Sequence, residues 1–396
     1  MKEGWTYKPL GEIATFIKDG DWIESKDQSE SGIRLIQTGN VGYGVFKLKD
    51  DKPHYITEET MGRLGCTEIF EGDCLVSRLP NPVGRACLIP DIGCRMITAV
   101  DCSIIRFGVD YLPQFFVYYT QSYKYLNSID DKTTGTTRKR ISRKNLEKIQ
   151  IPFPPIAEQE RIVERLDAAF AQIDELKNNA ERQLAEARAL FQSALTQAMQ
   201  PKPGWQEKKL GDISIISGDY GLSVPSKPFD GIRYLRITDI TEWGNLNDEK
   251  VSADFDGEIT KEKLEEGDVL FARTGATVGK TLVYRESFGD CLYAGYLIRY
   301  RINKKEVLPQ FLHYFTHSKD YFDWVLLNQK AAAQPNINAK KYNGLVIKFP
   351  SIAEQQTVIN YLDSLFSKLH ELEGINQEIV AECDALKQAL LRQIFE

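Results

Sequence analysis

Long apolar runs are missing from this sequence of 396 residues. A membrane-spanning helix needs about 20 consecutive apolar residues, and no segment approaches that length. The first residues, MKEGWTYKPL, also lack the apolar core of a secretory signal peptide. We therefore expect a cytoplasmic protein without a membrane partner.

Metal-ligand and catalytic motifs are also scarce. The seven cysteines include no C-x2-C or C-x4-C pair, and the four histidines form no H-E-x-x-H motif. We expect reduced, mostly buried cysteines and no metal site, with a metal or redox role as the alternative. GATVGKT at 275–281 resembles a phosphate-binding loop, but Thr274 stands where that loop needs glycine. No nucleophile elbow is found in the sequence either. The chain is therefore predicted to be a binding protein without an enzymatic activity of its own.

An internal repeat with an offset of about 200 residues is the most informative feature present. Five segments return in the same order: GWTYKPLGEI (4–13) as GWQEKKLGDI (204–213), GIRLIQTGNV (32–41) as GIRYLRITDI (231–240), EGDCLVSR (71–78) as EGDVLFAR (266–273), LPQFFVYY (112–119) as LPQFLHYF (308–315), and FPPIAEQ (153–159) as FPSIAEQ (349–355). The offset far exceeds the ~20–50 residues of solenoid repeats, so the chain holds a duplicated domain.

Each copy is predicted to combine a mixed α/β part with a long helix, which makes the fold class α+β. The runs IRLIQ, CLVSRL, CSIIRF, VLFAR and TLVYR indicate strands. A helical stretch follows each LPQF segment, at Phe115–Ser128 and Phe311–Asn328. By chain order we divide the sequence into a domain at 1–150, a helical spacer at 151–200, a second domain at 201–350 and a second spacer at 351–396.

Two long amphipathic helices are predicted from the spacing of apolar residues. From Ile162 and from Val358, apolar positions recur in ten steps over 36 residues, a period of 3.6. A helix about 60 Å long cannot pack on one small domain along its whole length, so its twin is the nearest candidate partner. The sequence alone leaves a parallel or an antiparallel pair open. The apolar residues assigned to pairing and partner binding are Leu166, Phe170, Ile173, Leu176, Leu362, Leu365, Leu369 and Leu372.

The net charge of −6 is unevenly distributed. Residues 1–150 and 201–350 each carry 21 cations and 20 anions, whereas 151–200 carry 5 against 8 and 351–396 carry 3 against 8. The two globular parts can therefore present basic surfaces. The acidic helices suit protein partners better than phosphate.

The strongest basic segment is Lys132–Lys148, with seven cations and one anion. Local positive charge and hydrogen-bond donors are what binding to a DNA backbone needs. The twin segment, Lys330–Lys348, is less basic but holds asparagine and glutamine, which can read adenine. A solvated loop is the alternative for the first segment and a turn for the second. The candidate DNA contacts are Arg138, Lys139, Arg140 and Arg143 in the first segment, and Gln334, Asn336, Asn338 and Lys340 in the second.

A second candidate surface follows the EGD segments. The first copy reads RLPNPVGR at 78–85 and the second RTGATVGK at 273–280. Both keep a cation at each end and a Val-Gly step but differ between them, as two similar domains that read different targets would need. A hairpin turn with flanking cations is the alternative. The candidate DNA contacts are Arg78, Asn81, Arg85, Arg273, Thr274 and Lys280.

Over its whole length, the chain resembles the DNA-specificity subunits of type I restriction-modification enzymes. The resemblance rests on the GW-x4-LG-[DE]-I starts, the Gly-Asp steps at Gly72–Arg78 and Gly267–Arg273, and the Glu-Gln openings of the long helices at Pro152–Gln159 and Ser351–Gln355. Ser351 departs from Pro155 of the first copy. The family pattern is a target-recognition domain and a conserved helical spacer, each present twice.

The resemblance implies an antiparallel coiled coil of the two spacers with pseudo-twofold symmetry, and recognition domains at opposite ends. Each domain would read one half of a bipartite, asymmetric site in double-stranded DNA. The helices would set the spacing of the halves and dock two methyltransferase (modification) subunits. This chain would hold no cofactor of its own. S-adenosylmethionine would belong to the modification partner, and ATP and Mg to a restriction or translocase partner where one is present.

Two alternatives stay open from the sequence. The chain could be the specificity subunit of another methylation-based system, type IIB-like or directed at phage. It could also be a duplicated protein-binding scaffold without DNA specificity. The acidic helices fit a scaffold, but the basic segment Lys132–Lys148 does not.

Overall fold

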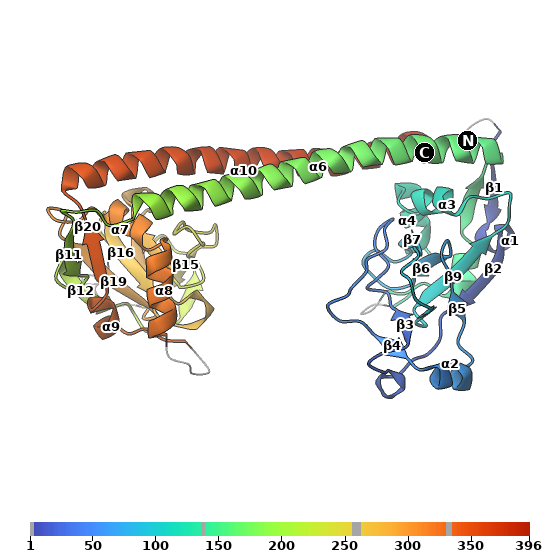
Figure 1. Cartoon of the computed structure of the whole chain (residues 1–396), viewed down its shortest axis with the longest axis horizontal. Helices are drawn as coiled ribbons and strands as arrows, with labels where there is room; N and C mark the ends of the chain where they lie inside the picture. The colour runs from blue at the N-terminus through green and yellow to red at the C-terminus, as the bar shows by residue number, and fades with distance from the viewer. Residues whose placement is uncertain (1–3, 136–138, 256–262, 330–334) are drawn as a thin grey trace. The chain divides into compact units, whose positions relative to one another are not determined.

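The computed structural model describes residues 4–135, 139–255, 263–329 and 335–396. They form two compact units: unit 1 is Met1–Glu181 with Gln377–Glu396, and unit 2 is Arg182–Asn376. In each unit a globular part packs on portions of the same two long helices, α6 (Ile156–Ala198) and α10 (Ile352–Phe395) (Figure 1). The predicted segments follow chain order, whereas each compact unit takes part of both helices. Among the described residues, no helix is long and apolar enough to cross a membrane.

Unit 1 contains two four-stranded sheets. One has the antiparallel order β2 (Ala14–Asp19), β9 (Cys102–Phe107), β6 (Cys74–Ser77), β7 (Ala86–Leu88). The other has the order β4 (Tyr55–Ile56), β3 (Ile33–Ile36), β8 (Met96–Thr98), β5 (Glu68–Ile69), with β3 and β8 parallel. A ribbon of β1 (Thr6–Pro9) and β10 (Gln150–Phe153) leads into α6. The shorter helices are α1 (Leu10–Ile13), α2 (Glu58–Leu64), α3 (Pro113–Tyr119), α4 (Tyr123–Asp130) and α5 (Arg143–Glu147).

Unit 2 repeats this plan. Its four-stranded antiparallel sheet has the order β12 (Ser214–Tyr220), β19 (Leu297–Ile302), β16 (Asp268–Ala272), β17 (Thr281–Val283). The smaller pairs are β11 (Gln206–Lys209) with β20 (Val346–Phe349), β13 (Ser226–Pro228) with β15 (Val251–Ala253), and β14 (Arg233–Leu235) with β18 (Cys291–Tyr293). The shorter helices are α7 (Pro309–Phe315), α8 (Lys319–Asn328) and α9 (Ala339–Asn343). The five predicted strand runs are confirmed as β3, β6, β9, β16 and β17.

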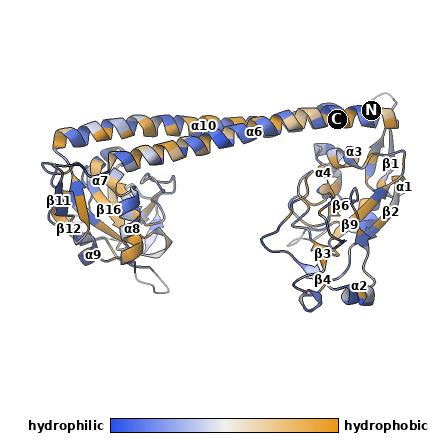
Figure 2. Ribbon diagram, viewed as in Figure 1, coloured by the Kyte–Doolittle hydropathy of each residue, from blue (hydrophilic) through white to orange (hydrophobic). Residues whose placement is uncertain are grey.

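The two predicted long helices are confirmed, with 43 residues in α6 and 44 in α10. Apolar and polar residues alternate along both (Figure 2). In unit 1, Lys177 lies 3.1 Å from Asp384, and Arg165 donates to Gln393 at 3.4 Å. Later residues of α6 thus face earlier residues of α10, so the helices are antiparallel.

Unit 2 shows the same antiparallel arrangement. Arg188 lies 2.7 Å from Glu373, and the ring centroids of Phe191 and Phe366 are 5.5 Å apart. Most of the apolar residues assigned to the helix faces are buried or half-buried. Leu176 is the exception, because the residue is 59% exposed and takes no part in the core.

One prediction about the shorter helices is wrong. The stretches Phe115–Ser128 and Phe311–Asn328 are each two helices, α3 with α4 and α7 with α8. The breaks come where Ser122 and Ser318 cap the second helix, accepting hydrogen bonds from the N–H groups of Tyr125 (3.2 Å) and Tyr321 (3.5 Å). A serine at this position favours a new helix start over continuation.

The cysteines are all free, as predicted. Cys74, Cys87 and Cys102 are buried on neighbouring strands β6, β7 and β9. Burial raises the pKa of the Cys102 thiol to about 11 and that of Cys87 to about 12. Thiols with raised pKa values are poor nucleophiles and metal ligands, so these three serve the core.

The recurring motifs hold the same contacts in both units. Gln159 is fully buried, accepts from the N–H of Leu112 (2.8 Å) and donates to the carbonyls of Asp110 (3.0 Å) and Pro154 (2.9 Å). Gln355 makes the three equivalent hydrogen bonds in unit 2. The glutamine of each Glu-Gln opening thus ties the start of a long helix to the start of α3 or α7.

Candidate nucleic-acid interface

The hairpins β6–β7 and β16–β17 share one backbone conformation at the Val-Gly step noted in the sequence. Gly84 and Gly279 have φ values of +84° and +90°, which strongly favour glycine. Their carbonyls accept hydrogen bonds from the hydroxyls of Tyr125 (3.0 Å) and Tyr321 (2.7 Å). The Val-Gly step therefore serves the fold, and the residues before it are free to differ.

In unit 1, Arg78 sits at the centre of an alternating set of charges. Its N–H donates to the carbonyl of Asp101 (2.9 Å), and its carbonyl accepts from Ile141 (3.3 Å). Its buried guanidinium lies 3.4 Å from Asp19, and the guanidinium of Arg140 pairs with the Asp101 carboxylate at 2.9 Å. Burial lowers the pKa of Arg78, while Asp19 and Asp101 act against that shift. The four side chains sum to zero charge.

In unit 2, Arg273 occupies the equivalent position with different neighbours. The backbone bonds recur: Arg273 donates to the carbonyl of Tyr296 (3.0 Å) and accepts from Ile337 (2.9 Å). The guanidinium lies over the ring of Tyr220, 4.9 Å from its centroid, and its Nε is buried without a hydrogen-bond partner among the described residues. Tyr220 and Tyr296 are 43% and 61% exposed. Asn336, at the position of Arg140, forms a short bridge with the neighbouring strand end.

The cations that end the two candidate segments, Arg85 and Lys280, form hydrogen bonds within the protein. Arg85 is buried and donates to four carbonyls, those of Val41 and Leu79 (2.7 Å each), Thr38 (2.8 Å) and Pro82 (3.0 Å). Lys280 reaches the carbonyl of Ile240 at 3.3 Å. Arg85 therefore holds a loop against the hairpin, and its assignment as a DNA contact gives way to a structural one. Arg78 is likewise too buried to touch DNA and positions Asp19 instead.

The remaining predicted contacts are spread over exposed and partly exposed positions. Asn81 is exposed at the hairpin tip, and Thr274 is half-buried in the bridge with Asn336. Arg138 and Gln334 lie outside the described residues. The others are Lys139, which pairs with Asp130 (3.4 Å), Arg143, which pairs with Glu147 (3.2 Å), Asn338, which caps α9, and Lys340, which is exposed.

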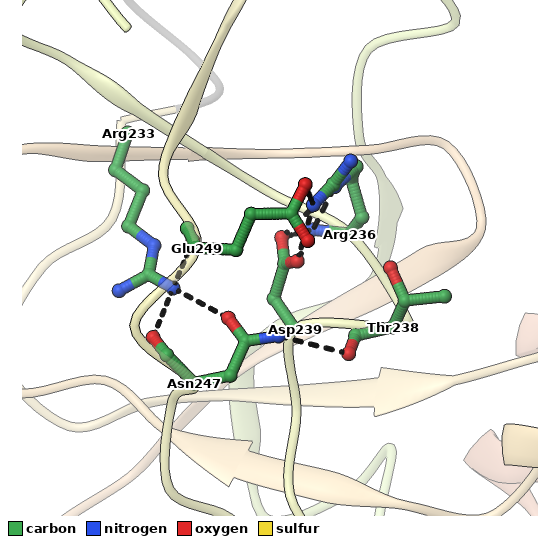
Figure 3. A network of polar contacts seen from close by, with 6 residues as sticks. All are labelled: Arg233, Arg236, Thr238, Asp239, Asn247 and Glu249. Atoms are coloured by element: carbon green, nitrogen blue, oxygen red, sulfur yellow. Dashed lines mark hydrogen bonds and ion pairs between the residues drawn. The ribbon is translucent and has the colours of Figure 1, made fainter. Parts of the chain in front are cut away.

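A polar network folds the loop that follows β14 in unit 2 (Figure 3). Arg236 pairs with Asp239 (2.8 Å) and Glu249 (3.0 Å). Arg233 donates to the carbonyls of Asn247 (2.7 Å) and Glu249 (2.8 Å). These bonds fix both ends of the loop. Lys280 also holds the middle of the loop through its hydrogen bond to the carbonyl of Ile240. The loop therefore presents a defined surface beside the hairpin.

The tip of this loop packs on the long helices within unit 2. The ring of Trp243 lies 5.2 Å from that of Phe191 and 5.4 Å from that of Phe366, centroid to centroid. It also stacks on His317 at 5.0 Å. In unit 1, Tyr43 takes the equivalent place and donates to the carbonyl of Gln121 at 2.7 Å.

The sequence analysis missed Asp19, Asp101, Tyr220 and Tyr296. None of them lies in a basic segment, so a search for positive charge passes over them. The signal was in the repeat itself: Asp19 and Tyr220 precede the equivalent glycines Gly20 and Gly221. A Cβ at Gly20 would lie 2.3 Å from the main-chain oxygen of Ala99, and one at Gly221 would lie 2.1 Å from that of Tyr293. That close approach fixes the position of the residue before it.

Residues 2–186 and 202–381 each match the family described as type I restriction modification DNA specificity domain. The chain belongs to this family. The two matches cover most of the chain and correspond to the two copies of the repeat.

Curated relatives of the family are similar over long stretches. The chain is 25% identical over 425 residues to the specificity subunit of the type I restriction enzyme EcoKI from Escherichia coli K12, covering 100% of this chain and 89% of that protein. It is 26% identical over 299 residues to the EcoBI specificity subunit from Escherichia coli, covering 68% of this chain and 63% of that relative.

Two solved structures share the fold. A chain from a study of complex assembly and conformational transition of the type I R-M system has a TM-score of 0.77 at 20% identity, covering 100% of this chain and 98% of that one. The HsdS subunit from Thermoanaerobacter tengcongensis has a TM-score of 0.56 at 21% identity, covering 100% and 97%. The likeness supports the arrangement of two mixed domains and two long helices in this DNA-specificity chain.

Proposed function

We propose that this chain is the non-catalytic DNA-specificity subunit of a type I restriction-modification complex, in which each unit reads one half of a bipartite, asymmetric site in double-stranded DNA. The observation that carries the proposal is the presence of two complete copies of the DNA-specificity domain in one chain. Because the exposed side chains around Arg78 and Arg273 differ in kind, the two halves of the site would differ in sequence.

The long helices α6 and α10 would set the separation of the half-sites and dock two methyltransferase subunits. Their excess of acidic residues makes them poor surfaces for DNA phosphates. Leu176, Leu190 and Leu386 are exposed on these helices and would be available to such a partner.

The cofactors would belong to the partners. The modification subunits would bring S-adenosylmethionine, and a restriction or translocase subunit, where present, would use ATP and Mg. Methyl transfer requires the target base to leave the stack, so the specificity chain would bind DNA that its partners deform. The complex would act in the cytoplasm, where its DNA substrate lies.

Methylation-sensitive long-read sequencing of cells with and without this gene tests the proposal. We expect one split, asymmetric methylated motif to disappear on deletion and to return when the full chain is supplied again. Cells that keep this chain but lack the methyltransferase partner provide the control and should lose the same motif. An identical set of methylated motifs in all these cells would contradict the proposed function.

A further inference from the structure

Around each central arginine, three equivalent positions carry exposed or partly exposed side chains on the same backbone frame. In unit 1 they are Asp19, Asp101 and Arg140, and in unit 2 they are Tyr220, Tyr296 and Asn336. We call these sets the unit 1 patch and the unit 2 patch. Assigning them a role rests on the proposed function.

The backbone frame of the two patches is the same. In each unit the arginine N–H donates to the residue at the second position of the patch, and the arginine carbonyl accepts from the residue after the third. The residue at the first position precedes a glycine, Gly20 or Gly221. A side chain at that glycine would clash with the adjacent main chain. The side chains at these positions therefore extend from equivalent backbone positions in the two units, although the residue types differ.

The chemistry at these matching points is different. Unit 1 offers two carboxylates, which only accept hydrogen bonds when ionised, and one guanidinium, which only donates. Unit 2 offers two tyrosines and an amide, beside an arginine with no ion pair among the described residues. Where the repeat serves structure, by contrast, the residue type is kept, as at Gln159 and Gln355 or at Asp73 and Asp268.

We propose that these patches are the specificity-determining surfaces of the two units, with Arg78 and Arg273 as the positioning residues behind them. The patches would read base edges of duplex DNA. Arginine matches the O6 and N7 atoms of guanine, asparagine matches the N6 and N7 atoms of adenine, and a carboxylate accepts from the amino group of cytosine. The unit 1 patch thus suits a G·C pair through Arg140 and Asp101, and the unit 2 patch suits an adenine through Asn336.

The test uses the full chain assembled with its methyltransferase partner. Binding is measured by fluorescence anisotropy on three duplexes: the intact site, the site with one half scrambled, and the site with the other half scrambled. The ratio of dissociation constants gives the discrimination at each half. The variants are Arg140→Ala for unit 1, and Tyr296→Ala, Asn336→Ala and Asn336→Asp for unit 2. Asn336→Asp keeps the side-chain shape while removing the amide donor.

Matched controls remove similar side chains elsewhere in the same unit. Arg95→Ala deletes a guanidinium that is also ion-paired and has 48% of its side chain exposed, against 45% for Arg140. Phe322→Ala deletes an exposed aromatic ring on α8. Neither control should change either ratio.

We expect Arg140→Ala to lower discrimination at one half-site by about tenfold, and the unit 2 variants to lower it at the other half-site by a similar factor. Unchanged ratios in every patch variant, or equal losses at both halves, would overturn the assignment while leaving the proposed function in place. A wild-type complex that ignores both halves would overturn the proposed function and the assignment with it.

Discussion

Single buried glutamines fix where each long helix joins its globular part. Gln355 accepts from Leu308 (2.8 Å) and donates to the carbonyls of Glu306 (2.8 Å) and Pro350 (2.9 Å). Replacing it with leucine keeps the approximate volume but leaves three buried polar groups without partners. Each such group destabilises a fold by about 1 to 3 kcal/mol.

Gln355→Leu is therefore expected to lower the free energy of unfolding by at least about 3 kcal/mol, measured by urea unfolding. Gln356→Leu is the matched control, because Gln356 is exposed and bonds only to Asn360 on the same helix among the described residues. Equal effects of the two substitutions would contradict the role assigned to the buried glutamine.

Unit 2 buries two histidines at positions where unit 1 has no titratable side chain. His313 and His317 on α7 and its C-terminal turn correspond to Val117 and Gln121 in unit 1. Burial lowers the pKa of His313 well below its ordinary value, and the positive charges of His317 and Arg285 add to the shift. Burial also lowers the pKa of His317.

Because the folded state resists protonation of His313, the unfolded state binds more protons at low pH. Stability should thus be complete above about pH 6.5 and fall below it, by at most about 1.4 kcal/mol per pH unit for this group. Amide hydrogen exchange of α7 between pH 7.5 and 5.5 measures the slope. His313→Val, which installs the unit 1 residue, should reduce the slope and leave the contribution of His317, and an unchanged slope would show that other groups cause the acid sensitivity.

At the scale of elements, the α6–α10 pair is stabilised by a few buried apolar residues. Leu369 is buried in the core cluster of unit 2 together with Phe191 and Leu362. Leu369→Ala should lower the free energy of unfolding by about 2 to 5 kcal/mol, since it removes packing and leaves a cavity. Urea unfolding provides the measurement. Leu190→Ala on α6 of the same unit should change stability by less than about 0.5 kcal/mol, because Leu190 is exposed.

The sequence predicts these elements well where a period or a proline marks them. α6 begins directly after Pro155, and it ends at Ala198, before Pro201, which could not continue the helix because proline has no N–H to donate. The sequence predicts the elements less well where tertiary contacts decide where a helix ends or which residues are buried. The helical pattern continues across Thr120 and Gln121, and only the caps at Ser122 and Ser318 reveal two helices. The exposure of Leu176 likewise depends on the partner helix and not on its own periodicity.

The candidate site was harder to predict than the elements. Charge and amide content directed the sequence analysis to the segments that hold Arg140 and Asn336, whose contact with DNA stays a prediction. It could not show that Arg85 is buried by four carbonyls, because those carbonyls come from loops on both sides of the hairpin. Asp19 and Tyr220 carry no motif of their own, and only the matching hydrogen bonds of the two units identify them as equivalent.

At the scale of the whole molecule, the negative net charge does not indicate where DNA would bind, because the charge is unevenly distributed. The globular parts are almost neutral and hold the exposed cations Lys139 and Arg140, while α6 and α10 carry the negative excess. DNA binding driven by phosphate contacts releases counterions, so its dependence on salt reports how many such contacts exist.

Lys139→Ala combined with Lys144→Ala, two exposed lysines of the segment Lys132–Lys148 that lie outside the unit 1 patch, should weaken binding of the assembled complex and reduce the slope of log K against log salt by about one unit per lost phosphate contact. The dissociation constant is measured over a range of salt concentrations on the intact site. Neutralising Glu175 and Glu378, exposed acids of α6 and α10, serves as the control and should leave the slope unchanged. If the helix variants change the slope as much as the double alanine variant does, the DNA would also contact the helices. The basic surfaces of the globular parts would then not be the only source of its electrostatic binding.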